Sequence, residues 1–315
     1  MNKKVKLSKA NTNSEETVKK VKPPKRNSKR FRKLKFKSGL FIAPSFLGVM
    51  AFFLIPFCVI IYYSVLDNPI SANYVGFENF KNVAKNEAFM TAVKNTATFS
   101  AIAVPLAVVL SLILAMVLDL NIPFRSQFRT FFLSPMMVPV ASIVLIWQVL
   151  FHNNGAVNDV VMKFGVDRID WFKSDQAIIV IVILFLWKNL GYNMILFMAA
   201  LASIPKDILE VARLESANPI QTFFYVKTRY LSSTVLFVTI MSLISSFKIF
   251  REIYLLTTDY PYPTLYMLQH YMNNKFKKLD YQALSAGAIM MSIVMVLIIG
   301  LLFIVEERFG KDVEG

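Results

Sequence analysis

The 315-residue sequence has one cysteine, two histidines, ten glycines and 13 prolines. Cys58 has no partner for an intrachain disulfide, and no metal-ligand spacing surrounds His152 or His270, which we expect at the surface of outer loops. No G-x-x-x-x-G-K-[ST] phosphate loop occurs, because the only Gly-Lys pair, at 310 and 311, lacks the upstream glycine. Nor does any grouping of nucleophile, base and orienting residue stand out. We therefore expect no catalytic residue, no metal site and no cofactor bound by this chain.

Charged residues are also missing from long stretches of a chain that is 56% hydrophobic. Residues 38–66, 95–118, 130–151 and 281–305 contain no Asp, Glu, Lys or Arg. A bilayer core needs roughly 20 apolar residues in helical form, and each run is long enough. Two further apolar runs contain charged residues: 176–201 is interrupted by Lys188, and 230–254 ends in Lys248, Arg251 and Glu252. The sequence therefore predicts an all-α membrane protein with six transmembrane helices.

The net charge of +15 is concentrated at the N-terminus. Residues 1–38 hold fifteen Lys and Arg against Glu15 and Glu16, a net charge of +13. This segment has too few apolar residues to fold, so residues 1–37 are expected to be a disordered cytoplasmic tail attracted to anionic lipid rather than an arm that binds nucleic acid. No small-residue cleavage site follows, so the first apolar run is expected to be an uncleaved anchor.

The distribution of basic residues predicts the orientation in the membrane. With the N-terminus in the cytoplasm, the inside segments carry 23 Lys and Arg and the outside loops carry nine, although without the tail the inside count is only eight. Six spans return the C-terminus to the cytoplasm. The expected location is the plasma membrane of a bacterium, and the polar segment 202–229 lies on its cytoplasmic side.

That polar segment has the pattern of helix, break and helix. Apolar residues recur at three- and four-residue spacing on both sides of the break. Ser216, Asn218 and Pro219 provide cap and N1 chemistry for a second helix that begins near Pro219. Such an amphipathic element could lie on lipid headgroups or insert into a groove of another protein.

A family resemblance rests on this segment. "LASIPKDILEVARLESANPIQTFFYV", residues 201–226, resembles the cytoplasmic EAA loop of binding-protein-dependent ABC importers, in the maltose-type sugar permease family. Residues 76–83, 128–139 and 245–257 resemble further segments of that family, and the likeness covers residues 40–310. The resemblance implies a type I ABC importer permease fold for a domain at 38–310. It also implies a non-catalytic subunit, partnered by a second homologous permease, a cytoplasmic ATPase dimer that uses ATP and Mg²⁺, and an external substrate-binding protein.

The imported substrate implied by the resemblance is a sugar, most readily an oligosaccharide. Basic residues at membrane depth keep a polyol phosphate such as glycerol 3-phosphate open as an alternative. A self-sufficient secondary transporter is a third reading, but it predicts inverted repeats, which the sequence does not display.

The resemblance assigns the EAA loop to coupling with the ATPase. The implied coupling residues are Glu210, Ala212, Glu215, Ser216, Ala217, Gln221, Phe223 and Phe224. Ser216 stands where the family has a turn glycine. Serine adopts positive φ less cheaply than glycine, so Ser216 either caps the second helix with ordinary dihedrals or carries local strain.

A substrate pathway is expected among the third, fourth and fifth spans. The resemblance implies Met136, Val140, Trp187, Asn189, Ser245, Ser246 and Ile249 as its lining, and membrane depth adds Lys188, Lys248 and Arg251. Trp187 could stack on a sugar ring, or it could fill space between helices. The charged residues could equally form structural ion pairs, with Glu252 paired to Lys248 four residues earlier. Trp147 and Trp171 are expected in the outer interfacial belt.

Overall fold

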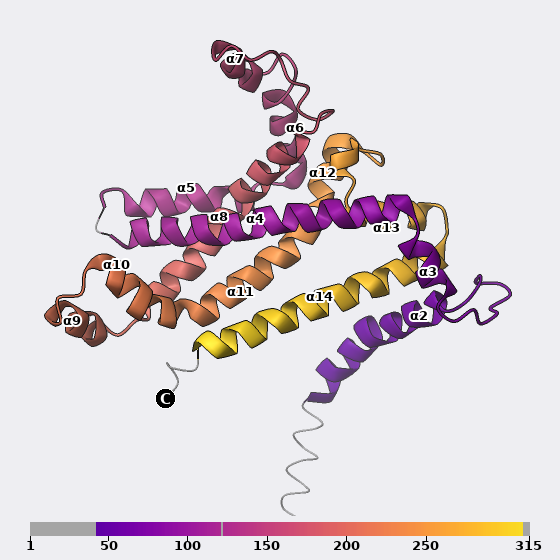
Figure 1. Cartoon of the computed structure of the whole chain (residues 1–315), viewed down its shortest axis with the longest axis horizontal. Helices are drawn as coiled ribbons and strands as arrows, with labels where there is room; N and C mark the ends of the chain where they lie inside the picture. Colours follow the sequence, from indigo (N-terminus) through magenta and orange to yellow (C-terminus); the bar gives the residue numbers. More distant parts are fainter. Residues whose placement is uncertain (1–41, 121, 311–315) are drawn as a thin grey trace, which may run out of the picture. The chain divides into compact units, whose positions relative to one another are not determined.

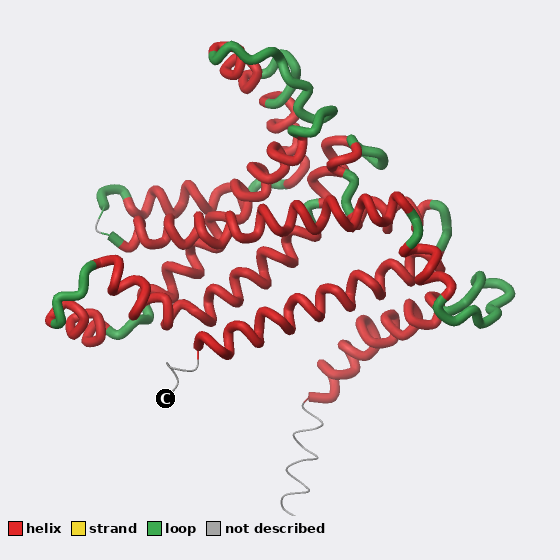
Figure 2. Tube along the Cα trace, in the orientation of Figure 1, coloured by secondary structure: helices red, strands yellow, loops and turns green. Residues whose placement is uncertain are grey.

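The computed structural model describes residues 42–120 and 122–310, with the side chains of 309 and 310 left out. Apart from loops and an isolated bridge between Leu66 and Tyr74, this part of the chain is helical (Figure 2). It divides into two units, one ending at Pro56 and one beginning at Phe57. The cavities and helix pairs described below all lie in the second unit. The expected disordered tail, 1–37, lies outside the described residues.

Several described helices are suited to crossing a membrane. Five are long and apolar enough: Ile42–Ser64, Glu87–Asp119, Ala177–Ala202, Pro219–Thr257 and Tyr281–Arg308. The bent pair Arg125–Met137 and Val140–Leu150 provides a sixth if it is one span. The fold class expected from the sequence, an all-helical protein with six apolar spans, is confirmed in this sense.

The long helices are joined by shorter ones (Figure 1). The elements are η1 (Met50–Leu54), α2 (Ile55–Ser64), α3 (Glu78–Ala84), α4 (Glu87–Asp119), α5 (Arg125–Met137), α6 (Val140–Leu150), α7 (Ala156–Lys163), α8 (Ala177–Ala202), α9 (Lys206–Leu214), α10 (Pro219–Gln221), η2 (Thr222–Lys227), α11 (Thr228–Phe247), α12 (Phe250–Thr257), η3 (Pro263–Leu265), α13 (Leu268–Lys277) and α14 (Tyr281–Gly310).

The third span differs from the straight helix expected at 130–151. It is broken between α5 and α6, whose axes differ by 100°. Val138 at the break is extended, with ψ of 132°, and Pro139 follows it. Proline has no N–H to donate and disfavours a helical residue before it, which explains the break. The absence of charge marked this run as apolar but did not reveal its interruption.

Helix α8 lies at the centre of the second unit, where it packs on α4, α5 and α11. Its contact with α5 requires Gly191, because a Cβ at that position would lie 1.9 Å from the carbonyl oxygen of Phe132. Only glycine permits so close an approach between the two backbones. The close approach holds α8 against the helix that precedes the break.

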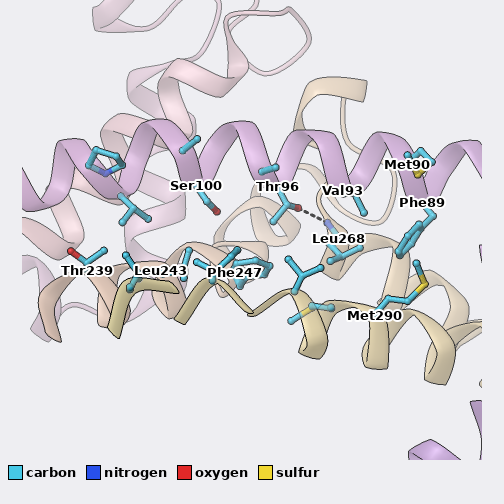
Figure 3. Close-up of a pocket in the computed structure, with 18 residues that line it drawn as sticks. Phe89, Met90, Val93, Thr96, Ser100, Thr239, Leu243, Phe247, Leu268 and Met290 are labelled. Atoms are coloured by element: carbon cyan, nitrogen blue, oxygen red, sulfur yellow. Dashed lines mark hydrogen bonds between the residues drawn. The ribbon is translucent and has the colours of Figure 1, made fainter. Parts of the chain in front are cut away.

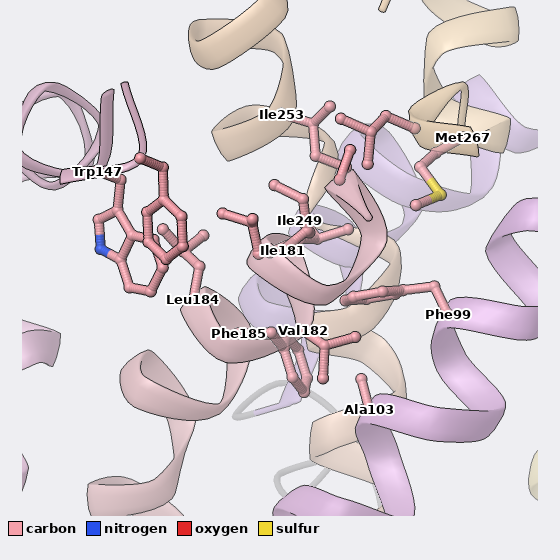
Figure 4. Close-up of a cluster of buried hydrophobic side chains, with 14 of the residues drawn as sticks. Phe99, Ala103, Trp147, Ile181, Val182, Leu184, Phe185, Ile249, Ile253 and Met267 are labelled. Carbon is pink, nitrogen blue, oxygen red and sulfur yellow. The ribbon is translucent and has the colours of Figure 1, made fainter. Parts of the chain in front are cut away.

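The largest buried cluster joins α4, α6, α8 and α12 (Figure 4). Phe99 and Phe185 meet edge to face with ring centroids 5.5 Å apart, and Ile249 and Ile253 belong to the same cluster. Trp147 is only 7% exposed and stacks on Phe151 at 5.0 Å. Its ring therefore fills space between α6 and α8, and its place in an interfacial belt stays a prediction.

A second surprise is His270 on α13, which is fully buried, whereas the sequence suggested a surface position. Its Nδ1 accepts a hydrogen bond from the backbone N–H of Met267 at 3.2 Å. Burial lowers the pKa of His270 to about 4, although the charge of Asp259 acts in the opposite direction. His270 therefore caps the start of α13 as a neutral ring. His152 is exposed, as expected.

Candidate functional site

Two adjoining cavities lie between α8 and the α11–α12 segment. The larger has a volume of about 530 Å³ and the smaller about 320 Å³. Both are lined by Lys188, Asn189, Ser245 and Lys248. Side chains three or four residues apart share one face of a helix, so α8 also presents Tyr192 and Asn193, and α11 presents Met241. The remaining lining residues are Phe185, Ile249, Phe250, Arg251, Glu252 and Gln269 in the larger cavity and Met136 and Ile244 in the smaller.

A third hollow of about 490 Å³ is formed by α4, α11, α13 and α14 and has a different character (Figure 3). Its lining is almost wholly apolar, with Leu243, Phe247 and Met290 among its residues. The hydroxyl of Thr96 at its edge already accepts a hydrogen bond from the backbone N–H of Leu268 at 2.9 Å. Few groups remain there to bind a polar ligand, so the two polar cavities are the candidate functional site.

The break between α11 and α12 positions the charged residues that line the polar cavities. The N–H of Lys248 donates to the carbonyl of Ser245 at 3.1 Å, and the N–H groups of Arg251 and Glu252 donate to Lys248 and Ile249 at 3.3 and 3.1 Å. These bonds span three residues, as in a tighter 3₁₀ turn. The turn changes the direction of the side chains that follow it, and it brings Glu252 to α8.

Glu252 forms an ion pair with Lys188, whose Nζ donates to Oε1 of the carboxylate. The expected pair of Glu252 with Lys248, four residues earlier, is wrong because the turn interrupts the regular helical spacing. Glu252 is only 3% exposed, and its second oxygen, Oε2, is buried with no hydrogen-bond partner among the described residues. A buried carboxylate needs a cation beside it, and Lys188 of α8 provides one.

Two further cations line the larger cavity without such a partner. Lys248 and Arg251 are exposed to it, and within the described ranges neither makes an ion pair. Three cations, counting Lys188, and one carboxylate give the lining a net charge of +2. The site thus combines fixed positive charge with amide and hydroxyl groups.

Most of the residues expected along the pathway meet at these cavities. Met136, Lys188, Asn189, Ser245, Lys248, Ile249 and Arg251 line them, whereas Val140, Trp187 and Ser246 do not. Ser246 is 1% exposed and its hydroxyl bonds that of Ser100 on α4 at 2.8 Å. The ring of Trp187 is 38% exposed and lies 6.3 Å from that of Trp147. It therefore packs beside the core cluster rather than at the cavity.

Other cavity residues were not anticipated. Tyr192 and Asn193 follow Lys188 and Asn189 by four residues, so helical spacing alone could have identified them. Asn193 also donates to the hydroxyl of Ser242 at 2.9 Å, which fixes its amide. Gln269 comes from α13, outside every expected span, and no pattern in the sequence indicated that it would reach the cavity.

The EAA-like segment forms α9, a turn, α10 and η2, which continues into α11 (Figure 1). Helix α9 ends in a Schellman motif: the N–H of Ala217 donates to the carbonyl of Ala212 and that of Ser216 to Arg213, both at 3.0 Å. Ser216 has φ of 60°, the left-handed conformation in which glycine is usual at this position. Of the two alternatives for Ser216, local strain is thus the one observed.

The second short helix is capped by Asn218 instead. The side chain of Asn218 accepts from the N–H of Gln221 at 2.8 Å, and the Gln221 side chain accepts from the N–H of Asn218 at 2.9 Å. This is a reciprocal capping box, followed by Pro219 at N1 as the sequence indicated. The cap starts a new helix immediately after the Schellman turn.

The surface of this segment is unusually apolar for an exposed element. Leu214, Ile220 and Phe224 are 84%, 69% and 64% exposed. Among the implied coupling residues, Glu210, Glu215, Ser216 and Gln221 are also exposed, Ala217 and Phe223 are half-buried, and Ala212 is buried. Exposed apolar groups rimmed by charge are typical of a protein-binding surface.

Comparison with known proteins supplies the family context. The family model described as "Binding-protein-dependent transport system inner membrane component" matches residues 107–314. The probable ABC transporter permease protein YesP of Bacillus subtilis is 26% identical over 293 residues, which cover 89% of this chain and 92% of that protein. The sn-glycerol-3-phosphate transport system permease protein UgpA of Yersinia pseudotuberculosis is 29% identical over 276 residues, 86% of this chain and 92% of that protein.

Two further similar proteins are named for the transport of an oligosaccharide and of a polysaccharide. The arabinooligosaccharides transport system permease protein AraP of Halalkalibacterium halodurans is 26% identical over 191 residues, 58% of this chain and 59% of that protein. The crystal structure of a bacterial ABC transporter involved in the import of the acidic polysaccharide alginate has a chain of the same fold. It superposes with a TM-score of 0.76 at 18% identity and covers 90% of this chain and 99% of that one.

Proposed function

The chain belongs to the family of binding-protein-dependent transport system inner membrane components, and from this premise we propose that it is the permease subunit of an ATP-driven importer for a sugar, most simply an oligosaccharide. The observation that carries the proposal is a polar cavity between α8 and α11–α12 inside an otherwise apolar helix bundle. Relatives named as permeases for arabinooligosaccharides and sn-glycerol-3-phosphate support a polyhydroxylated substrate.

The cavity lining suits such a ligand. Asn189, Ser245 and Gln269 offer amide and hydroxyl groups for hydrogen bonds to hydroxyls, and Phe185 and Phe250 offer apolar surface for the C–H face of a ring. Because sugar sites combine aromatic surface with a small number of polar groups, this lining supports the proposal better than the apolar hollow does.

In this proposal, another chain hydrolyses ATP. The segment 202–229 serves as the coupling element and docks in a cleft of a cytoplasmic ATPase subunit, with Mg²⁺ and ATP bound there. Leu214, Ile220 and Phe224 act as its apolar anchors, and Glu210 pairs with a basic residue of the ATPase. Both termini then lie in the cytoplasm.

A second homologous permease subunit and an external substrate-binding protein complete the importer. ATP binding draws the coupling elements together, and the membrane helices exchange an inward-open cavity for an outward-open one. The substrate shifts this equilibrium only through its different affinities for the two states. The strained turn at Ser216 joins the coupling element's two helices and transmits their movement to α11.

The test of this proposal is to disrupt the coupling surface while leaving the membrane helices intact. Glu210→Arg and Ala217→Asp should each reduce ATP-dependent uptake into proteoliposomes by roughly tenfold or more, because reversing a paired charge, or placing a charge in a packed interface, costs about 2 kcal/mol. Insertion and basal ATPase activity should be retained. Glu78→Arg on α3 is a matched control for Glu210→Arg, because it makes the same charge change outside the coupling segment. Normal uptake by both loop variants would refute the docking role.

A polyol phosphate such as glycerol 3-phosphate is a second candidate substrate, favoured by the net charge of +2 in the cavity lining. Competition of labelled uptake by neutral oligosaccharides and by phosphate esters separates the two candidates. ATP-independent uptake by the purified chain alone, driven by an ion gradient, would contradict both and point to a secondary transporter.

A further inference from the structure

The charges of the larger cavity are not balanced, and this imbalance narrows the class of substrate. We propose that the cavity binds an anionic polyhydroxy compound, with Lys248 and Arg251 holding its acidic group and Glu252 accepting a hydrogen bond from one of its hydroxyls. The inference rests on the import function proposed above and restricts its substrate to sugars or polyols that carry a carboxylate or a phosphate ester.

The positive charge is available to a ligand because only one of the three cations is neutralised inside the protein. Lys188 is paired with Glu252, whereas Lys248 and Arg251 face the cavity and form no ion pair with any described residue. Lys248 lies within the apolar span Pro219–Thr257, where an uncompensated cation is costly. An anion in the cavity offsets that cost, whereas a neutral sugar does not.

The spacing of the two cations suits an acidic group. Lys248 lies in the turn between α11 and α12, Arg251 follows three residues later in the first turn of α12, and both line the larger cavity. The planar guanidinium of arginine can donate two parallel hydrogen bonds to a carboxylate or phosphate, and the lysine adds a point charge.

Glu252 indicates that the ligand also carries hydroxyl groups. The Glu252 side chain belongs to the cavity lining, and its buried Oε2 has no donor among the described residues. A buried carboxylate oxygen without a donor is unfavourable, and such atoms are rare in folded proteins. A simple inorganic anion would be repelled by this oxygen, but the hydroxyl of a sugar acid or sugar phosphate can donate to it.

The electrostatic part of the proposal can be measured directly with charged thiol reagents. Ser245 lines both cavities, so Ser245→Cys places a thiol there, in a Cys58→Ser background that removes the chain's only native thiol. The full-length chain is purified with the subunits that accompany it. Its reaction rates with sulfonatoethyl and trimethylammonioethyl methanethiosulfonate are compared, each normalised to the rate with a small thiol in solution.

The normalised reaction rate with the anionic reagent should be roughly ten times that with the cationic reagent, because nearby charges act strongly in a site of low dielectric constant. Lys248→Gln and Arg251→Gln should each lower the ratio of the two rates several-fold, and Glu252→Gln should raise it because Lys188 loses its counterion. Lys163→Gln on α7 removes the same charge outside both cavities and should leave the ratio unchanged. A ratio near one in the parent, or one that neither cavity variant lowers, would overturn the proposal.

Ligand protection identifies the source of the negative charge. Digalacturonate, glycerol 3-phosphate and neutral galactobiose are tested for slowing the reaction of the same thiol with uncharged methyl methanethiosulfonate. At least threefold protection by one of the anions, lost in Arg251→Gln, supports the proposal and distinguishes a carboxylate from a phosphate ligand. Equal protection by galactobiose, or none by either anion, refutes it.

These results are separable from the import function itself. ATP-driven uptake of a neutral sugar by a complex in which anions do not protect the thiol would refute the anion site and support the import function. Protection by anions in a complex without ATP-dependent uptake would support the anion site and count against import.

Discussion

The ion pair between Lys188 and Glu252 is the contact on which the geometry of the polar cavities most depends. Lys188→Met removes the cation and leaves the carboxylate, which is 3% exposed, without its partner. Breaking a buried pair in this way typically costs about 3–5 kcal/mol. The Lys188 side chain is 29% exposed, and Lys248 and Arg251 line the same cavity, so we expect a smaller loss of about 2–3 kcal/mol in the free energy of unfolding.

The reverse change, Glu252→Gln, should cost less, about 1 kcal/mol, because Lys188 can reach water in the cavity. The double variant Lys188→Met/Glu252→Gln leaves no buried charge at this contact and should lose less than the sum of the two single losses, with a coupling energy of about 1–2 kcal/mol. Reversible unfolding by SDS in mixed micelles, followed by circular dichroism, measures all four proteins. Lys188→Met as stable as the parent, or a double variant with strictly additive losses, would refute the ion-pair argument.

Two other predictions concern the strained turn and the buried histidine. Ser216→Gly should stabilise the turn by about 1 kcal/mol, because glycine adopts φ of 60° without the steric cost that serine bears, and hydrogen exchange at the Ala217 amide should slow. His270 titrates near pH 6.5 when unfolded and near 4 when folded, so stability is complete above about pH 6.5 and falls by at most about 3 kcal/mol as the pH drops to 4. The pH dependence of the unfolding midpoint measures this slope, and His270→Gln should flatten it.

Each of these predictions has a matched control. Ser203→Gly changes a residue with φ of −82° and should destabilise slightly, so equal effects at both serines would contradict the strain argument. His152→Gln removes the exposed histidine and should leave the slope between pH 4 and 6.5 unchanged. A slope that survives in His270→Gln would show that another group causes it.

The sequence predicted the elements well and several contacts badly. Uncharged runs identified the helices because a bilayer-spanning helix must be apolar throughout, and that property is local. Helical spacing predicted an ion pair between Glu252 and Lys248. The turn at Lys248 and Ile249 interrupts that spacing, and Glu252 instead pairs with Lys188, 64 residues away. The family resemblance gave Trp187 a role in the pathway, yet its ring lies beside that of Trp147 and lines neither cavity.

The sequence by itself determined the helical membrane fold and the polar segment at 202–229, with Asn218 and Pro219 at the start of its second helix. Hydrophobic length and cap chemistry act over a few residues. The tertiary structure decided that Pro139 breaks the third span, that Ser216 takes positive φ, and that Gln269 joins α8 and α12 around a positively charged cavity. The cavity depends on which helices pack together, and packing is fixed by contacts between residues far apart in the chain. At Pro139 and Ser216 the local sequence permits more than one backbone conformation, and the folded structure shows which one is taken.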